Sequence, residues 1–100
     1  MSTNRNLPER AAADIRRLAK KHGVEKVVLF GSRARGTHGP KSDIDLAVYG
    51  GRDNIAAFAG AVEDEAWTLL PFDLIDMNAP LSGEFVAGVE REGVVLYEKV

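Results

Sequence analysis

The stretch Leu29-Phe-Gly-Ser-Arg-Ala-Arg-Gly-Thr-His-Gly-Pro-Lys-Ser-Asp-Ile-Asp-Leu-Ala-Val48 decides the fold of this chain of 100 residues. Its two ends belong to apolar runs at 24–30 and 43–49, which are short and bounded by glycines and are therefore predicted to be strands. Only twelve residues lie between the two runs. A parallel crossover needs about a dozen residues or more, usually including a helix. We therefore expect an antiparallel pair, joined by a Gly-Ser turn, a short helical turn and a loop.

The rest of the chain supplies the other elements of a layered fold. Apolar residues at helical spacing, with Asn6 and Ser82 as capping residues, predict helices at 6–22, 53–70 and 82–92. Further strands are predicted at 72–77 and 94–97. This order predicts one domain over residues 1–100 of the α/β class, in which helices flank a small mixed β-sheet.

Two aspartates open the second predicted strand and project from the same face of it. Side chains alternate along a strand, so Asp43 and Asp45 point to one side while their apolar neighbours point to the core. Adjacent carboxylates repel each other unless a cation lies between them, and such oxygen ligands suit Mg²⁺. Asp73, early in the third predicted strand, is the expected third ligand of a site for two ions. Asp76 lies on the opposite face of that strand and is ranked lower.

The Gly-Ser turn fits the other half of a site for a metal-bound polyphosphate. Gly31 allows a phosphate to approach the backbone closely, and the amides that follow, with the Ser32 hydroxyl, are candidate donors to it. Arg33 and Arg35 are candidates for balancing phosphate charge, and Ser42 is a further candidate nucleotide-binding residue.

A structural interpretation stands beside each of these features. Gly-Ser turns are frequent, and an Asp-x-Asp pair alone is a weak signal that also occurs at caps and surfaces. The basic residues of the first helix are interpreted as a solvated face, with docking of an acidic partner as the alternative. His38 is expected to be a solvated loop residue. The functional interpretation depends on the joint pattern of strand, Gly-Ser, Asp-x-Asp strand and later aspartate.

Composition narrows the class of protein. The net charge is −2, from 13 basic and 15 acidic residues, so the chain lacks the basic excess of a general nucleic-acid binder and no direct nucleic-acid binding is expected. It contains no cysteine, which excludes disulfides and thiolate metal sites. No segment resembles a signal peptide or a membrane span. A cytoplasmic protein with no membrane partner is expected.

The motif resembles a known signature. Gly31-Ser32, ten intervening residues and Asp43-x-Asp45 are similar to the signature of the DNA polymerase β nucleotidyltransferase superfamily. Within it, the run GSRARGTHGPKSDIDLAV and the ending EREGVVLYE resemble the minimal nucleotidyltransferases, over nearly the whole chain. The resemblance implies Mg²⁺ ions held by Asp43, Asp45 and Asp73, phosphate bound at Gly31-Ser32, and transfer of AMP from ATP to a hydroxyl group.

The resemblance also implies a partner. Because the sequence contains little beyond the catalytic core, we expect the acceptor to be held by another subunit. Minimal nucleotidyltransferases are commonly paired with a HEPN-domain ribonuclease toxin, and the implied role is an antitoxin that adenylylates a tyrosine of that toxin. Two alternatives remain open at this stage. One is a non-catalytic module that binds nucleotide and partner, and the other is a nucleotidyltransferase that modifies small molecules such as antibiotics.

Overall fold

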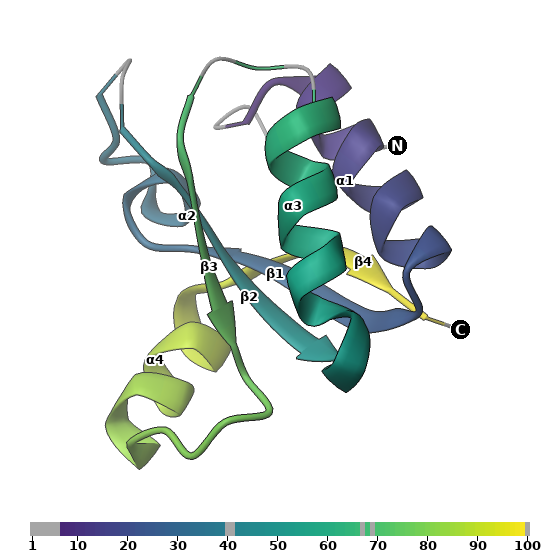
Figure 1. Ribbon diagram of the computed structural model, residues 1–100. Coiled ribbons are helices and arrows are strands. Elements are labelled where there is room, and N and C mark those ends of the chain that lie inside the picture. The colour runs from purple at the N-terminus through teal and green to yellow at the C-terminus, as the bar shows by residue number, and fades with distance from the viewer. Residues whose placement is uncertain (1–6, 40–41, 67, 69, 100) are drawn as a thin grey trace.

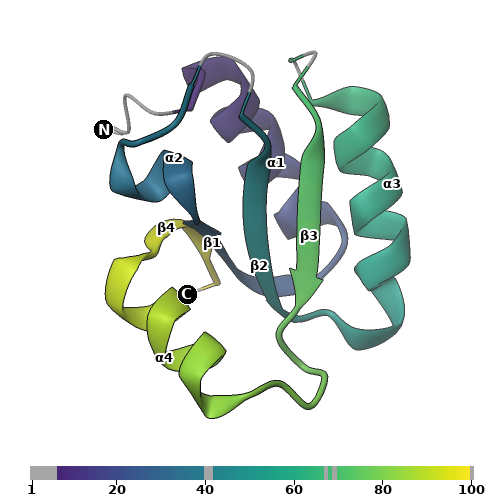
Figure 2. The same cartoon turned by 90° about the vertical axis from the view of Figure 1, so that its left-hand side faces the viewer.

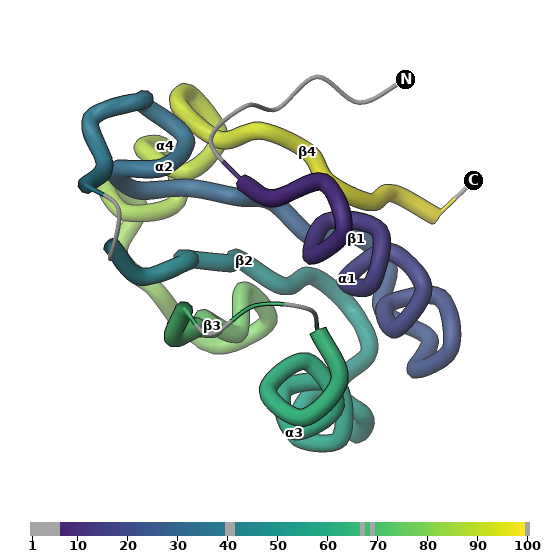
Figure 3. The backbone as a smooth tube through the Cα atoms, turned by 90° about the horizontal axis from the view of Figure 1, so that it is seen from above, coloured from purple at the N-terminus to yellow at the C-terminus, as the bar shows by residue number. Residues whose placement is uncertain are grey.

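A computed structural model describes residues 7–39, 42–66, 68 and 70–99 of the chain. Its centre is a four-stranded sheet with the order β3-β2-β1-β4, formed by β1 (Val24–Phe30), β2 (Ile44–Gly50), β3 (Phe72–Asp76) and β4 (Val94–Glu98). Strand β1 pairs antiparallel with β2 and with β4, whereas β2 pairs parallel with β3. Figure 3 shows this order from above, with β2 between β1 and β3. The mixed sheet and the antiparallel first pair confirm the prediction from the loop length.

The helices divide between the two faces of the sheet. Helices α1 (Glu9–Lys21) and α3 (Ile55–Glu65), the latter preceded by the 3-10 turn η1 (Arg52–Asn54), lie on one side of the strands. Helix α4 (Gly83–Glu92) lies on the other side (Figure 1). The four-residue helix α2 (Ser32–Arg35) follows β1 directly and lies above α4 beside β1 (Figure 2).

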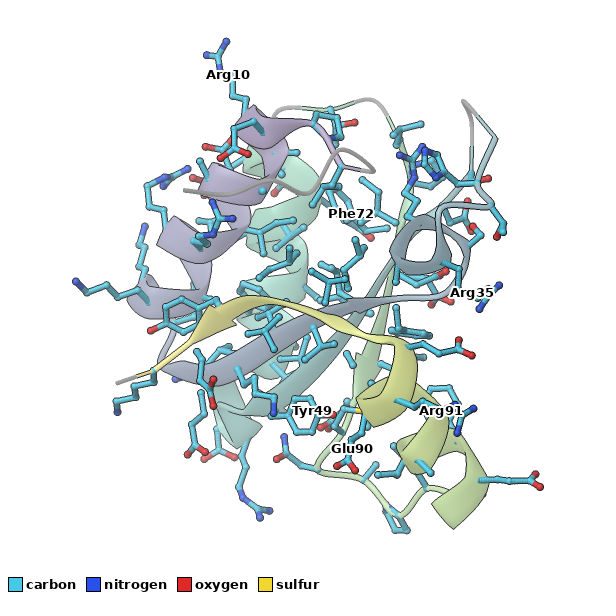
Figure 4. The ribbon with its side chains drawn as sticks, turned by 180° about the vertical axis from the view of Figure 1, so that it is seen from behind. Arg10, Arg35, Tyr49, Phe72, Glu90 and Arg91 are labelled. Atoms are coloured by element: carbon cyan, nitrogen blue, oxygen red, sulfur yellow. The ribbon has the colours of Figure 1, made fainter. Side chains whose placement is uncertain are left out.

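The main core lies between the sheet and the pair α1 and α3. The residues that line it are fully or almost fully buried, because the apolar stripes of both helices meet the inward side chains of the strands. Its largest members are Ile15, Leu18, Leu29, Ile44, Leu46 and Phe58. A smaller cluster under α4 consists of Val28, Ala47 and Val89, with Phe30, Tyr49, Met77 and Phe85 packed against it. At its far end Tyr49 of β2 points toward α4 (Figure 4), and burial together with Glu90 raises the pKa of Tyr49.

Two helix ends differ from the sequence prediction. Helix α3 stops at Glu65, not near Leu70, because Ala66 adopts an extended backbone with ψ 136° and its carbonyl accepts a hydrogen bond from the Thr68 amide. A helix running to Leu70 would also have conflicted with the following proline, which disfavours helical geometry in the residue before it. Helix α1 begins after Pro8 and has no side-chain cap there. The expected cap Asn6 lies outside the described residues.

The start of the last helix is as predicted. The Ser82 hydroxyl accepts a hydrogen bond from the Phe85 amide at 3.1 Å, which is the capping contact expected from the sequence. Within the described part of the chain, no helix has the length and apolar character that crossing a bilayer requires.

Candidate active site

A row of three side chains crosses the face of the sheet that α4 covers only in part. In the strand register Phe30 of β1 lies opposite Asp45 of β2, and Asp45 lies beside Asp73 of β3. Paired positions on neighbouring strands project to the same face, so these three side chains lie side by side. The structure therefore brings together the two aspartates that the sequence placed on separate strands. Asp43 comes just before β2 and is exposed, as Asp73 is.

Gly31 presses against this row. Its backbone has φ 76° and ψ −155°, a conformation that is essentially restricted to glycine. A Cβ atom at this position would lie 3.2 Å from Cγ of Asp45 and closer still to one of its carboxylate oxygens. The backbone of the Gly-Ser turn thus passes directly beside the central carboxylate. A phosphate held by this turn would lie within reach of any cation that Asp45 binds.

The turn itself is fixed by backbone hydrogen bonds. The amides of Ala34 and Arg35 both donate to the Gly31 carbonyl at 3.1 Å, and the Thr37 amide donates to the Ser32 carbonyl at 3.0 Å. These bonds form the short helix that the sequence predicted at this position. Ser32 lies in the first turn of this helix and is half-buried. It directly follows Gly31, the residue that lies against Asp45.

The two arginines of this turn have different surroundings. Arg33 is only 4% exposed, and its Nε donates to the Ser42 carbonyl at 3.0 Å, which ties α2 to the residue before Asp43. Arg35 is exposed and its guanidinium lies between α2 and α4, where Nη1 contacts Oε1 of Glu92 at 3.3 Å (Figure 4). The contact of Arg33 fixes the position of Ser42 relative to α2. The phosphate contacts expected of both arginines stay predictions.

Ser42 and His38 belong to the loop that leads into β2. The Ser42 hydroxyl accepts a hydrogen bond from the Gly39 amide at 2.8 Å, and the Ser42 amide donates to the Gly39 carbonyl at 3.2 Å. Ser42 therefore closes this loop, and its contact with nucleotide stays a prediction. His38 is half-buried, and its Nδ1 is buried with no hydrogen-bond partner among the described residues, so its side chain is solvated only in part.

Burial and neighbouring charges act together on the pKa of Asp45. Burial, and then the negative charges of Asp73 and Asp43, raise the pKa of Asp45, whereas the positive charge of Arg35 lowers it. A divalent cation beside Asp45 would favour its ionised form, and carboxylate oxygens are the ligands that Mg²⁺ prefers. The described residues contain no group of three or more His, Cys, Asp or Glu side chains already arranged around a metal position. Asp43 and Asp73 are exposed, so rotamer changes can turn them toward a cation at Asp45.

Asp76 has a structural role at the end of β3. It lies beside Val48 in the register, and its carboxylate accepts hydrogen bonds from the amide and the side chain of Asn78, both at 2.8 Å. Asn78 in turn bonds the backbone of Gly50. This turn joins the ends of β2 and β3, in agreement with the lower rank given to Asp76.

A pocket beside the carboxylate row was not predicted from the sequence. It has a volume of about 330 Å³ and lies between the end of β1, helix α2 and helix α4. We name it the α2–α4 pocket, lined by Phe30, Gly31, Arg35, Glu84, Phe85, Gly88, Val89 and Glu92. The spacing of residues in the last predicted helix places Phe85, Val86 and Val89 toward the core, and no local signal shows that this helix lies beside Gly31.

Comparisons with known proteins agree with this geometry. The model of the family described as "Polymerase beta, Nucleotidyltransferase" matches residues 13–100. No curated protein matches the sequence. A crystal structure of a toxin-antitoxin with AMP-PNP is similar over 88% of this chain and 73% of its own, with a TM-score of 0.64 and 23% identity. A mutant of the toxin-antitoxin MntA-HpeT, with two Asp-to-Glu changes, is similar over 88% of this chain and 73% of its own, with a TM-score of 0.62 and 22% identity. At these identities the two structures show a shared fold.

Proposed function

Because this chain belongs to the polymerase beta nucleotidyltransferase family, we propose that it transfers AMP from ATP to a tyrosine of a HEPN-domain toxin and is the antitoxin of that pair. The observation that carries the proposal is the position of Gly31 against Asp45, in line with Asp73 on the next strand. This arrangement joins a phosphate-binding turn to a carboxylate cluster, which is what transfer from a metal-bound triphosphate requires.

Each part of the site has a role in this reaction. The turn at Gly31 and Ser32 binds the phosphates that leave, and Arg35 balances their charge. Asp43, Asp45 and Asp73 would hold Mg²⁺, which neutralises phosphate charge and lowers the pKa of the acceptor hydroxyl. The acceptor oxygen forms a bond to the α-phosphorus, the bond from that phosphorus to the bridging oxygen breaks, and pyrophosphate leaves. Asp73, at the edge of the row, accepts the proton of the hydroxyl.

The nucleotide and the partner are proposed from the structural neighbours. One neighbour is described with AMP-PNP, an analogue of ATP, and both are described as toxin-antitoxin structures. The two aspartates changed in the second neighbour are two positions apart, the spacing of Asp43 and Asp45 here. These descriptions, with the resemblance of the sequence to minimal nucleotidyltransferases, support ATP as donor and a HEPN toxin as acceptor.

The proposal is tested by incubating the full chain with ATP, Mg²⁺ and a HEPN-domain protein, and measuring the intact mass of the HEPN protein. We expect addition of AMP, mapped by fragmentation to tyrosine, and loss of the ribonuclease activity of the modified protein. The matched control is the double variant Asp43→Asn/Asp45→Asn, which should add no AMP. The transfer proposal is wrong if the wild-type chain binds the HEPN protein without adding mass, or if the double variant neutralises it equally well.

A further inference from the structure

The α2–α4 pocket is joined to the carboxylate row by three of its residues. Phe30 lines the pocket and is also the neighbour of Asp45 in the strand register. Gly31 lines the pocket and lies against the Asp45 carboxylate. Arg35 lines the pocket and lowers the pKa of Asp45 through its charge. A ligand in this pocket would therefore extend directly into the phosphate-binding turn.

The walls of the pocket suit a flat aromatic group. Phe30 and Phe85 meet edge to face, with ring centroids 5.7 Å apart and an interplanar angle of 88°. Both rings are only half-buried although they pack against the cluster under α4, so part of each ring remains available to a ligand. Aromatic side chains bind nucleobases by stacking, which tolerates any base because every base has a π-face.

The rim of the pocket carries hydrogen-bonding groups suited to a base. Glu84, Gly88 and Glu92 are spaced by four residues and lie along one face of α4. Gly88 has no side chain, so the space between the two carboxylates stays open. Glu84 and Glu92 are both exposed, and Glu92 is paired with Arg35 and Arg91. Carboxylates accept hydrogen bonds from amino groups such as those of adenine.

The geometry of the proposed transfer places the base and the acceptor at different ends of the site. In the proposed function the acceptor approaches on the side of Asp73, and the leaving pyrophosphate lies on the side of Gly31. The row runs Phe30, Asp45, Asp73, so the pocket and Asp73 lie at opposite ends of it. The acceptor is therefore placed away from the pocket, and the nucleoside of the donor is the substrate part left to fill it.

We propose that the α2–α4 pocket holds the base of the nucleoside triphosphate, stacked on Phe30 or Phe85 and bounded by Glu84 and Glu92. This inference rests on the proposed function, since it assigns the nucleotide end of the same site. It makes Gly88 the residue that keeps the pocket open.

Two glycines of the chain provide a matched experiment. Gly88→Leu places a side chain at the pocket, where a Cβ meets only the flexible end of Arg91 at 3.9 Å. Gly60→Leu makes the same change in α3, where a Cβ meets nothing within 4 Å. Leucine has a higher helix propensity than glycine, so neither change should prevent folding. Circular dichroism and thermal unfolding check this for both variants.

Binding is measured by calorimetry with two probes in Mg²⁺, AMP-PNP and inorganic tripolyphosphate, which has the phosphates without the nucleoside. We expect the wild-type chain to bind both, AMP-PNP more tightly. Gly88→Leu should weaken AMP-PNP at least about tenfold and leave tripolyphosphate unchanged, because the loss of base stacking alone is of that order. Gly60→Leu should change neither affinity. Phe85→Ala should weaken the binding of AMP-PNP about fivefold or more and leave the binding of tripolyphosphate unchanged.

Three results would overturn the assignment. Wild-type affinity of Gly88→Leu for AMP-PNP shows that the base lies elsewhere. The same affinity combined with lost modification of the HEPN protein assigns the pocket to the partner. Equal wild-type affinity for AMP-PNP and tripolyphosphate shows that the base contributes nothing. A wild-type chain that binds neither probe contradicts the phosphate site of the proposed function itself, which separates that failure from the other three.

Discussion

The two faces of the sheet differ in how they are covered. The face under α1 and α3 is closed, and its large side chains, such as Ile15 and Phe58, have no exposed surface. The face under α4 is covered by one helix of ten residues, and its buried cluster contains only Val28, Ala47 and Val89. Beyond that cluster lies the carboxylate row. Most of the apolar burial that stabilises the fold is thus on one face, and the polar groups of the candidate site are on the other.

This division has a physical reason. Carboxylates that bind a cation must stay hydrated and able to move until the cation arrives, which a closed apolar core does not permit. Asp43 and Asp73 are exposed, and Asp45 is half-buried with a raised pKa. The closed face offsets what this arrangement costs, because burial of large apolar side chains is the main favourable contribution to folding.

The largest loss of stability is expected when a phenylalanine on the closed face is replaced by alanine. Phe58→Ala removes a fully buried ring from α3 and should lower the free energy of unfolding by about 3–5 kcal/mol. Phe85→Ala removes a half-buried ring on the α4 face and should cost less than about half of that. Urea unfolding of both variants measures the difference. Equal losses in the free energy of unfolding would show that the two faces contribute equally to stability, and the contrast between them would be wrong.

The next effect separates the two arginines of α2. Arg33→Met removes a buried guanidinium whose Nε bonds the half-buried Ser42 carbonyl, and should cost about 1–3 kcal/mol of stability. Arg35→Met removes an exposed ion pair with Glu92, which should cost less than about 1 kcal/mol. Arg35→Met should instead weaken AMP-PNP binding in calorimetry. If Arg33→Met keeps full stability and loses nucleotide affinity, then both arginines bind phosphate, as the sequence alone suggested.

The two arginines show which features of the fold and the site the sequence predicts and which it does not. The antiparallel pairing of β1 with β2, the common face of Asp43 and Asp45 and the Gly-Ser turn follow from loop length, periodicity and glycine chemistry, which are local properties. That Asp73 lies beside Asp45 depends on which strand β3 pairs with. The burial of Arg33 depends on its contact with the Ser42 carbonyl, and the α2–α4 pocket depends on where a distant helix docks. No local sequence pattern encodes either contact, and the pocket in addition joins residues far apart in the chain. The predicted helix ended at Leu70 because of Pro71, but α3 ends at Glu65, where Ala66 turns to an extended backbone. A proline restricts only the residue directly before it, so Pro71 does not account for this earlier end.

An effect of similar size is expected where the turn meets the carboxylates. Gly31→Ala forces a residue with a Cβ into φ 76° and pushes that Cβ into Asp45, and should cost about 1–3 kcal/mol. Part of this cost is the collision, so adding Asp45→Ala should recover that part. In a double-mutant cycle followed by thermal unfolding, the double variant should lose less stability than the sum of the two single variants. Strict additivity would mean that the turn and Asp45 are not in contact.

The smallest effect is a gain in stability, and it tests the face under α4, where the carboxylate row lies. Burial and two neighbouring carboxylates raise the pKa of Asp45 above its ordinary value of 3.8, so its ionised form is disfavoured in the folded state. Wild-type stability from this group is therefore fully present below pH 3.8 and is lost as the pH rises through the raised pKa. Asp45→Asn should then melt a few degrees above the wild type at neutral pH without metal, and the gain should vanish in acid.

Magnesium should reverse this difference, because a cation bound at the row removes the repulsion that Asp45→Asn removes by neutralisation. Thermal unfolding with and without Mg²⁺ should show a higher melting temperature for the wild type and little change for Asp45→Asn. The matched control is Asp64→Asn, an exposed carboxylate on α3, which should follow the wild type in both conditions. If Asp45→Asn instead lowers the metal-free melting temperature at neutral pH, then the carboxylate supports the fold as the closed face does. The separation of stability and chemistry between the two faces would then be wrong at its central residue.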